Sequence, residues 1–286
     1  MAGLLSGLGK MGLGNLESMD LFDNQEEKES EGKEKEEKVP EVKEEEFLFD
    51  KKFECPVCYE KIRARTLRAG KIRLTRTDLD LRPVYEQLEP LKYDVVTCPH
   101  CGYAALARFF TGLTASQIKA IKETISKSFR ASEEEKEIYT YEEAINRYKL
   151  SLANTIVKHG KASEKAYTCL KAGWLLRSMA ENLDKADPEY EKKIKEAKEQ
   201  ERQFLKNALD GFLTARQNEN FPICGMDEIT LEYLIAVLAM EFEQYEISSR
   251  LISGILVSAS ASTRMKDKAR DVKELLIARI REKNAN

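Results

Sequence analysis

The pattern of apolar positions divides the chain into a short extended part and a long helical part. Up to about residue 104, apolar residues occur in brief runs that alternate with polar ones, which is typical of β-strands. From residue 104 to the end they recur every three or four positions, which indicates α-helices. Helices are expected over 116–128, 132–154, 163–182, 189–217, 227–241, 245–258 and 262–283. The predicted fold class is therefore mainly α, with a small β module followed by a helical array.

The extended part predicts one hairpin and one further strand. Residues 61–66 and 71–75 alternate on either side of Ala69-Gly70, as the two strands of a β-hairpin do. Residues 93–97 are a third candidate strand, and the proline-bearing stretches 78–83 and 88–94 are predicted loops.

Three of the predicted helices share a spacing pattern in which a small residue is followed by a bulky one four positions later. A small or apolar residue follows three positions further on, which is typical of the second helix of a tetratricopeptide unit. The spacings between copies, 64 and 40 residues, depart from the regular period of about 34. Any helical bundle with close crossings also explains the pattern. We predict a tetratricopeptide-like array and leave the general bundle as the alternative. The copies are Ala144/Tyr148/Ser151, Ala208/Phe212/Ala215 and Ser248/Ile252/Ile255.

The first 46 residues contain two segments of unusual composition. Residues 1–22 interleave glycine and leucine, which predicts a peptide that docks on its own helical domain, on a partner or on a membrane surface. The membrane is the weakest of these options, because Lys10 is the only basic residue there. Residues 24–46 hold eleven Glu and five Lys, which predicts a disordered acidic linker. The expected organisation is a peptide over 1–22, a linker over 23–46, a β module over 47–113 and a helical domain over 114–286.

Composition sets further bounds. The 286 residues are 42% apolar, enough for a substantial core, and the formal net charge of −3 indicates neither a nucleic-acid nor a membrane partner. No run of apolar residues is long enough for a transmembrane helix, and no secretory signal is recognisable, so we expect a cytoplasmic protein.

Two Cys-x-x-Cys motifs carry the clearest chemical signal. The first is Cys55-Pro-Val-Cys58, and the second is Cys98-Pro-His-Cys101 followed by Gly102. Two such tight turns aim four thiolates at one ion, which predicts a structural Zn²⁺ site and an elaborated zinc ribbon with 39 residues between the motifs. Disulfides fit a cytosolic chain poorly, and four thiolates leave no open position for catalysis. His100 is an alternative ligand, although an exposed loop histidine is the simpler interpretation.

Several of these stretches together resemble a bacterial family of unknown function, numbered 2225. They are the Gly/Leu start, the acidic linker, Phe47-Leu-Phe-Asp-Lys51, Asp80-Leu-Arg-Pro83, Pro90-Leu-Lys-Tyr-Asp-Val95 and the two cysteine motifs. The similarity covers nearly the whole chain. It implies a bacterial cytoplasmic zinc-ribbon protein with a tetratricopeptide-like C-terminal part, and it implies no activity.

Three functional hypotheses remain open from the sequence. The first is a non-enzymatic adaptor whose zinc module and helical array bind an unknown protein partner. The second is a nucleic-acid-binding protein, because seven basic residues and no acidic one occur along the predicted hairpin. The acidic linker is a competing occupant of that basic stripe, and base-stacking aromatic residues are missing from it. The basic residues are Lys61, Arg63, Arg65, Arg68, Lys71, Arg73 and Arg76.

An enzyme is the third hypothesis, and we expect the protein not to be one. Only two histidines are present, and no pairing of a nucleophile with a base is recognisable. The best catalytic candidates are the polar residues of the insertion, for which bracing of the insertion by pairing of Arg with carboxylates is the simpler role. These residues are Asp78, Asp80, Arg82, Tyr93 and Asp94.

Overall fold

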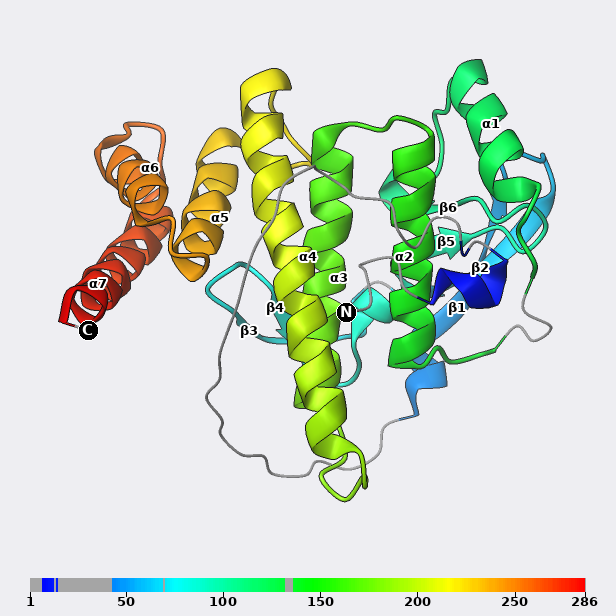
Figure 1. Ribbon diagram of the computed structural model, residues 1–286, viewed down its shortest axis with the longest axis horizontal. Helices are drawn as coiled ribbons and strands as arrows, with labels where there is room; N and C mark the ends of the chain where they lie inside the picture. Colours follow the sequence, from blue (N-terminus) through cyan, green and yellow to red (C-terminus); the bar gives the residue numbers. More distant parts are fainter. Residues whose placement is uncertain (1–6, 13, 15–42, 69, 132–135, 286) are drawn as a thin grey trace.

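The computed structural model describes residues 7–12, 14, 43–68, 70–131 and 136–285. Within this part the chain forms three small β-hairpins and a row of helices (Figure 1). Most of the predicted acidic linker and the first six residues lie outside the described residues. None of the helices described is long and apolar enough to cross a membrane.

The helices after residue 160 begin and end close to their predicted positions. Their apolar periodicity is strong, and an N-cap marks some of their first residues; for example, the Asp227 side chain accepts a hydrogen bond from the Thr230 amide at the start of α5. These helices are α3 (Ala162–Glu181), α4 (Tyr190–Asn218), α5 (Glu228–Glu241), α6 (Tyr245–Val257) and α7 (Thr263–Ala285).

Of the two earlier helices, one differs from prediction in its first residue and the other in its helix type. Helix α2 (Tyr141–Val157) begins nine residues later than expected, because Thr140 and Glu143 form a reciprocal capping box that fixes its first turn. Helix α1 (Ala115–Ile121) begins at a similar capping box formed by Thr114 and Gln117. It continues as a single π-helical turn, η6 (Lys122–Ser126).

The helices lie side by side in chain order, from α2 to α7 (Figure 1). The residues of the three spacing patterns are buried, and they fall on α2, α4 and α6, which are alternate helices of the row. Helices α3 and α4 span 20 and 29 residues, too many for one unit of about 34 residues, and this explains the long first interval. The predicted fold class, a small β module followed by a helical array, is confirmed.

The predicted hairpin over residues 61–75 is wrong. Strand β2 (Lys61–Leu67) pairs instead with β1 (Leu48–Glu54), in a register that aligns Phe53 with Ile62. Strand β3 (Leu74–Thr77) pairs with β4 (Pro83–Tyr85) in a separate sheet. The physical reason is burial: β2 places Ile62 and Ala64 in the core, whereas every residue of β3 is exposed and offers no apolar face for pairing with β2.

The third hairpin joins the β module to the helices. Strands β5 (Val95–Thr97) and β6 (Ala104–Leu106) pack on α2, and one core cluster runs from the β module through the helical row. The Tyr148 hydroxyl of α2 donates to the Leu91 carbonyl at 3.1 Å. Leu91 belongs to the short turn η4 (Pro90–Tyr93).

The insertion between the two cysteine motifs packs on α3 through buried ion pairs. Arg82 is 1% exposed and pairs with Asp78 at 2.6 Å and with Glu181 of α3 at 2.6 Å. Asp80 is also buried; it accepts a hydrogen bond from the Trp174 indole at 2.9 Å and pairs with Arg177 at 2.9 Å. These contacts agree with the bracing role expected for the Arg–carboxylate pairs.

Two short turns come from the segments of unusual composition. Turn η1 (Leu8–Met11) lies against α2, where Figure 1 draws it in dark blue. Turn η3 (Glu44–Phe47) is at the end of the predicted acidic linker. Its Glu44 carboxylate accepts hydrogen bonds from Lys92 at 2.9 Å and from the Tyr93 hydroxyl at 2.7 Å, so the last residues of that segment have a fixed place in the fold.

Candidate metal centre

Each cysteine motif occupies the turn of an antiparallel hairpin. The first lies between β1 and β2, and the second lies between β5 and β6. The same two backbone hydrogen bonds close each turn. The amide of the first cysteine donates to the carbonyl five residues on, at 2.9 Å for Cys55 and 2.7 Å for Cys98. Its carbonyl accepts from the amide four residues on, at 2.8 Å and 3.0 Å. The two turns therefore have equivalent backbone structures.

The residue that follows each motif has a left-handed backbone. Its φ angle is +66° at Tyr59 and +72° at Gly102. Glycine adopts this conformation without strain, whereas tyrosine does not. At Gly102 a second constraint acts, because an added Cβ would lie 2.4 Å from the Phe129 ring. Glycine is therefore required in the second turn and merely preferable in the first.

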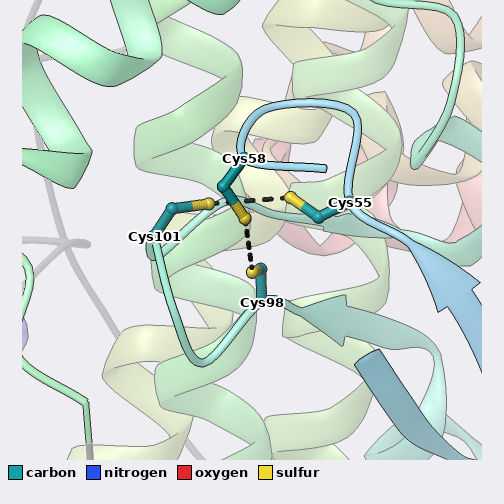
Figure 2. A group of neighbouring side chains, drawn as sticks. All are labelled: Cys55, Cys58, Cys98 and Cys101. Carbon is teal, nitrogen blue, oxygen red and sulfur yellow. Dashed lines mark hydrogen bonds between the residues drawn. The ribbon is translucent and has the colours of Figure 1, made fainter. Parts of the chain in front are cut away.

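The two turns bring the four sulfur atoms together (Figure 2). The Sγ atoms of Cys55 and Cys101 are 3.6 Å apart, those of Cys58 and Cys98 are 3.5 Å apart, and all four lie within 4.8 Å of one another. A disulfide requires about 2.05 Å. Four sulfurs at about 2.3 Å from a tetrahedral zinc ion would be about 3.8 Å apart. The spacing fits a shared ion and not a pair of disulfides.

The thiols influence one another's ionisation. The pKa of Cys55 is lowered, first by its hydrogen bond with Cys101 and then by that with Cys98. The pKa of Cys101 is raised, first by its hydrogen bonds with those same two thiols and then by burial. Ionisation of Cys55 to a thiolate is therefore favoured, and ionisation of Cys101 is disfavoured. Four thiolates in so small a space need a cation to balance their charge. Four thiolate sulfurs are a donor set that zinc prefers.

The remaining candidate ligands are not part of this cluster. Within the described residues, the four cysteines are the group that could hold a metal ion, and the His100 side chain is exposed beside them. Cys169 is buried in α3, and burial raises its thiol pKa. An ion held by all four sulfurs would have no open coordination position for substrate.

Two residues that support the second turn carry no metal-ligand signature in the sequence. The Phe129 ring lies against Gly102, and nothing in the local sequence distinguishes it from a core residue. Asn154 of α2 donates a hydrogen bond to the Gly102 carbonyl at 3.0 Å. The sequence does indicate a buried hydrogen bond for Asn154, because a polar amide within the largely apolar stretch 150–157 needs a buried partner.

The seven basic residues proposed for nucleic acid do not lie along one hairpin. Lys61, Arg63 and Arg65 are on β2 and Arg76 is on β3, which belong to different sheets, and the other three lie between these strands. Three of the seven pair with carboxylates of the folded chain. Arg65 contacts Asp50 and Glu137, Arg73 contacts Glu86, and Arg76 contacts Asp78 and Glu181. Arg68 donates to the Leu48 carbonyl. Six of the seven residues are exposed, and Arg65 is half-buried.

The fold and the cysteine cluster define a class: a protein with a four-cysteine β module joined to a helical array. The particular family follows from comparison with known families. Residues 48–276 match the family described as uncharacterized protein conserved in bacteria (DUF2225), and the chain belongs to it, as its sequence motifs indicated. No curated protein and no solved structure matches the chain.

Proposed function

We propose that the protein is a non-enzymatic adaptor, in which a zinc-stabilised ribbon holds one end of a tetratricopeptide-like array and the other end binds a protein partner. The ribbon and its insertion cover faces of α2 and α3. They leave the α6–α7 end of the array open (Figure 1). Cys55, Cys58, Cys98 and Cys101 would hold the ion, whose role is to fix the two turns and thereby the insertion between them.

The observation that carries the adaptor proposal is the apolar surface at the α6–α7 end. Val257 is 84% exposed, and Leu275 and Ile277 are 46% and 39% exposed. A surface pocket of about 470 Å³ is lined by Ile277, Leu256 and the charged residues Arg270, Lys273 and Glu274. Val257 follows Leu256 in the chain, whereas Leu275 lies on another face of α7 from Ile277. A pocket with an apolar floor and a charged rim is typical of protein-binding surfaces.

The placement of the basic residues supports the adaptor over the nucleic-acid hypothesis. Phosphate binding requires several uncompensated cations on one surface. Here Arg65, Arg73 and Arg76 are paired with acidic groups of the same chain. Only a weak, non-specific affinity for nucleic acid is expected from the remaining four, Lys61, Arg63, Arg68 and Lys71, which are exposed.

Site-specific photo-crosslinking in the native bacterial host tests the proposal. A benzoylphenylalanine at Ile277 is expected to give a discrete protein adduct, and Val257→Lys in the same chain is expected to abolish it. Leu74, which is 52% exposed on β3, is the matched control for a crosslinker at an exposed apolar position. Equal adducts from Leu74 and Ile277, or none from Ile277 and Leu275, would contradict the proposal.

A further inference from the structure

The glycine-rich turn near the N-terminus makes specific contacts with the helical part of the chain. The Arg130 amide donates a hydrogen bond to the Met11 carbonyl at 3.0 Å. The Met11 side chain is partly buried against the main core, and turn η1 lies against α2. Gly7 lies next to Asn146 of α2, where an added Cβ would be 3.2 Å from its Oδ1. The contact thus combines a backbone hydrogen bond, one apolar anchor and a close backbone approach.

At Gly12 this contact accepts only glycine. Its φ angle is +77°, and an added Cβ would lie 2.4 Å from the Ser128 carbonyl oxygen. The obstacle is backbone, so it cannot rotate away as a side chain can. Any larger residue is excluded both by its own backbone strain and by this overlap.

The segment that receives the turn also supports the second cysteine motif. Ser128 approaches Gly12, and the Arg130 amide donates to the Met11 carbonyl. Between them, the Phe129 ring lies against Gly102, the residue after Cys101. A peptide bound to residues 128–130 therefore contacts the same segment that positions Phe129 against the second cysteine turn.

We propose that residues 128–130 and the adjoining face of α2 form a peptide-binding site for a Met-Gly segment in a glycine-rich turn, and that its occupant is Gly7–Gly12 of the same chain. Binding is reversible, so the same peptide supplied from outside fills the site when the tethered copy is displaced. This site is separate from the α6–α7 surface, and the inference does not depend on the adaptor function or on bound metal.

Amide hydrogen exchange of the full-length protein tests the tethered contact. The Arg130 amide is expected to be protected in the wild type and to exchange about tenfold faster or more in Gly12→Val, because the displaced turn no longer accepts its hydrogen bond. Gly254→Val is the matched control, since an added Cβ at Gly254 of α6 meets nothing within 4 Å. Equal exchange at Arg130 in the wild type and Gly12→Val would overturn the proposal.

A synthetic peptide with the sequence of residues 1–14 tests binding from outside. Added to Gly12→Val, it is expected to restore protection at Arg130, whereas a peptide carrying Gly12→Val is not. The wild-type protein is expected to bind the peptide weakly, because its tethered copy competes at an effective concentration on the order of millimolar. Met11→Ser, which removes the anchor, should behave as Gly12→Val does. Failure of the peptide to restore protection in both variants would overturn the proposal.

Discussion

At the residue scale, the position after the second cysteine distinguishes the two turns. Tyr59 and Gly102 share a left-handed backbone and the same hydrogen bond to the first cysteine. Tyr59 is 63% exposed, so little packing is lost when it is replaced. Gly102 is enclosed by Phe129. Equivalent backbone positions therefore predict opposite responses to substitution.

Tyr59→Gly is expected to leave stability unchanged or to raise it by up to about 1 kcal/mol, because relief of backbone strain is partly offset by the entropy of glycine in the unfolded chain. Gly102→Ala is expected to lower stability by about 2 kcal/mol or more, from strain and overlap together. Urea unfolding of both variants measures the difference. Equal losses in the two would contradict the assignment of distinct roles.

The buried carboxyl of Glu89, in the insertion between the two cysteine motifs, is expected to make the stability of the fold depend on pH. Burial raises the pKa of its carboxyl, although the amide of Leu91 donates to it at 3.0 Å. Below the unfolded pKa, near 4.5, the carboxyl is protonated in both states and its contribution is intact. As the pH rises through the folded pKa the carboxyl ionises while buried, and stability is lost.

Glu89→Gln keeps the acceptor for Leu91 and removes the charge. The variant is expected to match the wild type near pH 4.5 and to become the more stable of the two at neutral pH. Urea unfolding at both pH values measures the stability difference, in which any effect of metal loss on both proteins cancels. A difference that stays constant with pH would show that burial of the charge costs nothing.

At the element scale, the insertion and α3 act as one unit. Asp80 joins them through Trp174 and Arg177, and Trp174 is the single tryptophan of the chain. Tryptophan fluorescence therefore reports directly on whether the insertion remains in place.

Asp80→Ala is expected to cost about 2 kcal/mol and to shift the fluorescence of Trp174, because it leaves a buried indole N–H and part of the half-buried Arg177 guanidinium without their acceptor. Asp80→Asn retains an acceptor for the indole and should shift the fluorescence much less. Urea unfolding and emission spectra measure both effects. An unchanged spectrum in Asp80→Ala would contradict the observed contact.

The helices after residue 160 were predictable because their signals are local. Apolar periodicity defines their faces, and residues such as Asp227 mark where they begin. The strand pairing was not predictable in the same way. Ala69-Gly70 looks like a hairpin turn, yet β2 pairs with β1, which precedes it across the first cysteine turn. Burial of Ile62 and Ala64 favours this pairing, and it depends on contacts of β2 with the later turn η4 and on the core that the two strands join.

The candidate metal site was predictable for a similar reason, since four cysteines in two short motifs carry their geometry with them. The supports of that site were less visible. Arg82 is almost completely buried, and its partner Glu181 is 99 residues away, so no local pattern reports the pair. The candidate metal ligands can therefore be identified from a single sequence more easily than the residues that position them.

At the scale of the whole molecule, charge pairing predicts how the chain meets nucleic acid. With Arg65, Arg73 and Arg76 paired internally, four exposed cations remain in this segment, namely Lys61, Arg63, Arg68 and Lys71, so affinity for duplex DNA through it should fall by no more than about 3.6 log units per log of salt. Deletion of residues 25–42 should strengthen binding if the acidic segment competes, and it spares Glu44, which holds Lys92. Filter binding across a salt series measures the slope. A much steeper slope would favour the nucleic-acid hypothesis.

Because the core is continuous, the candidate metal centre is expected to affect the stability of the whole molecule. The cysteine turns share one hydrophobic cluster with α2 and the helices beyond it, so the ribbon is part of the array and not an appended finger. An ion bound by the four cysteines would stabilise the folded state of both, because binding energy at a structural site is folding energy.

X-ray absorption at the zinc edge of purified full-length protein tests this account most directly. The account predicts one zinc per chain with four sulfur neighbours at about 2.3 Å, and loss of that shell in Cys58→Ser. Protein that contains no stoichiometric zinc while its thiols are reduced, or a zinc shell of nitrogen and oxygen neighbours, would contradict it.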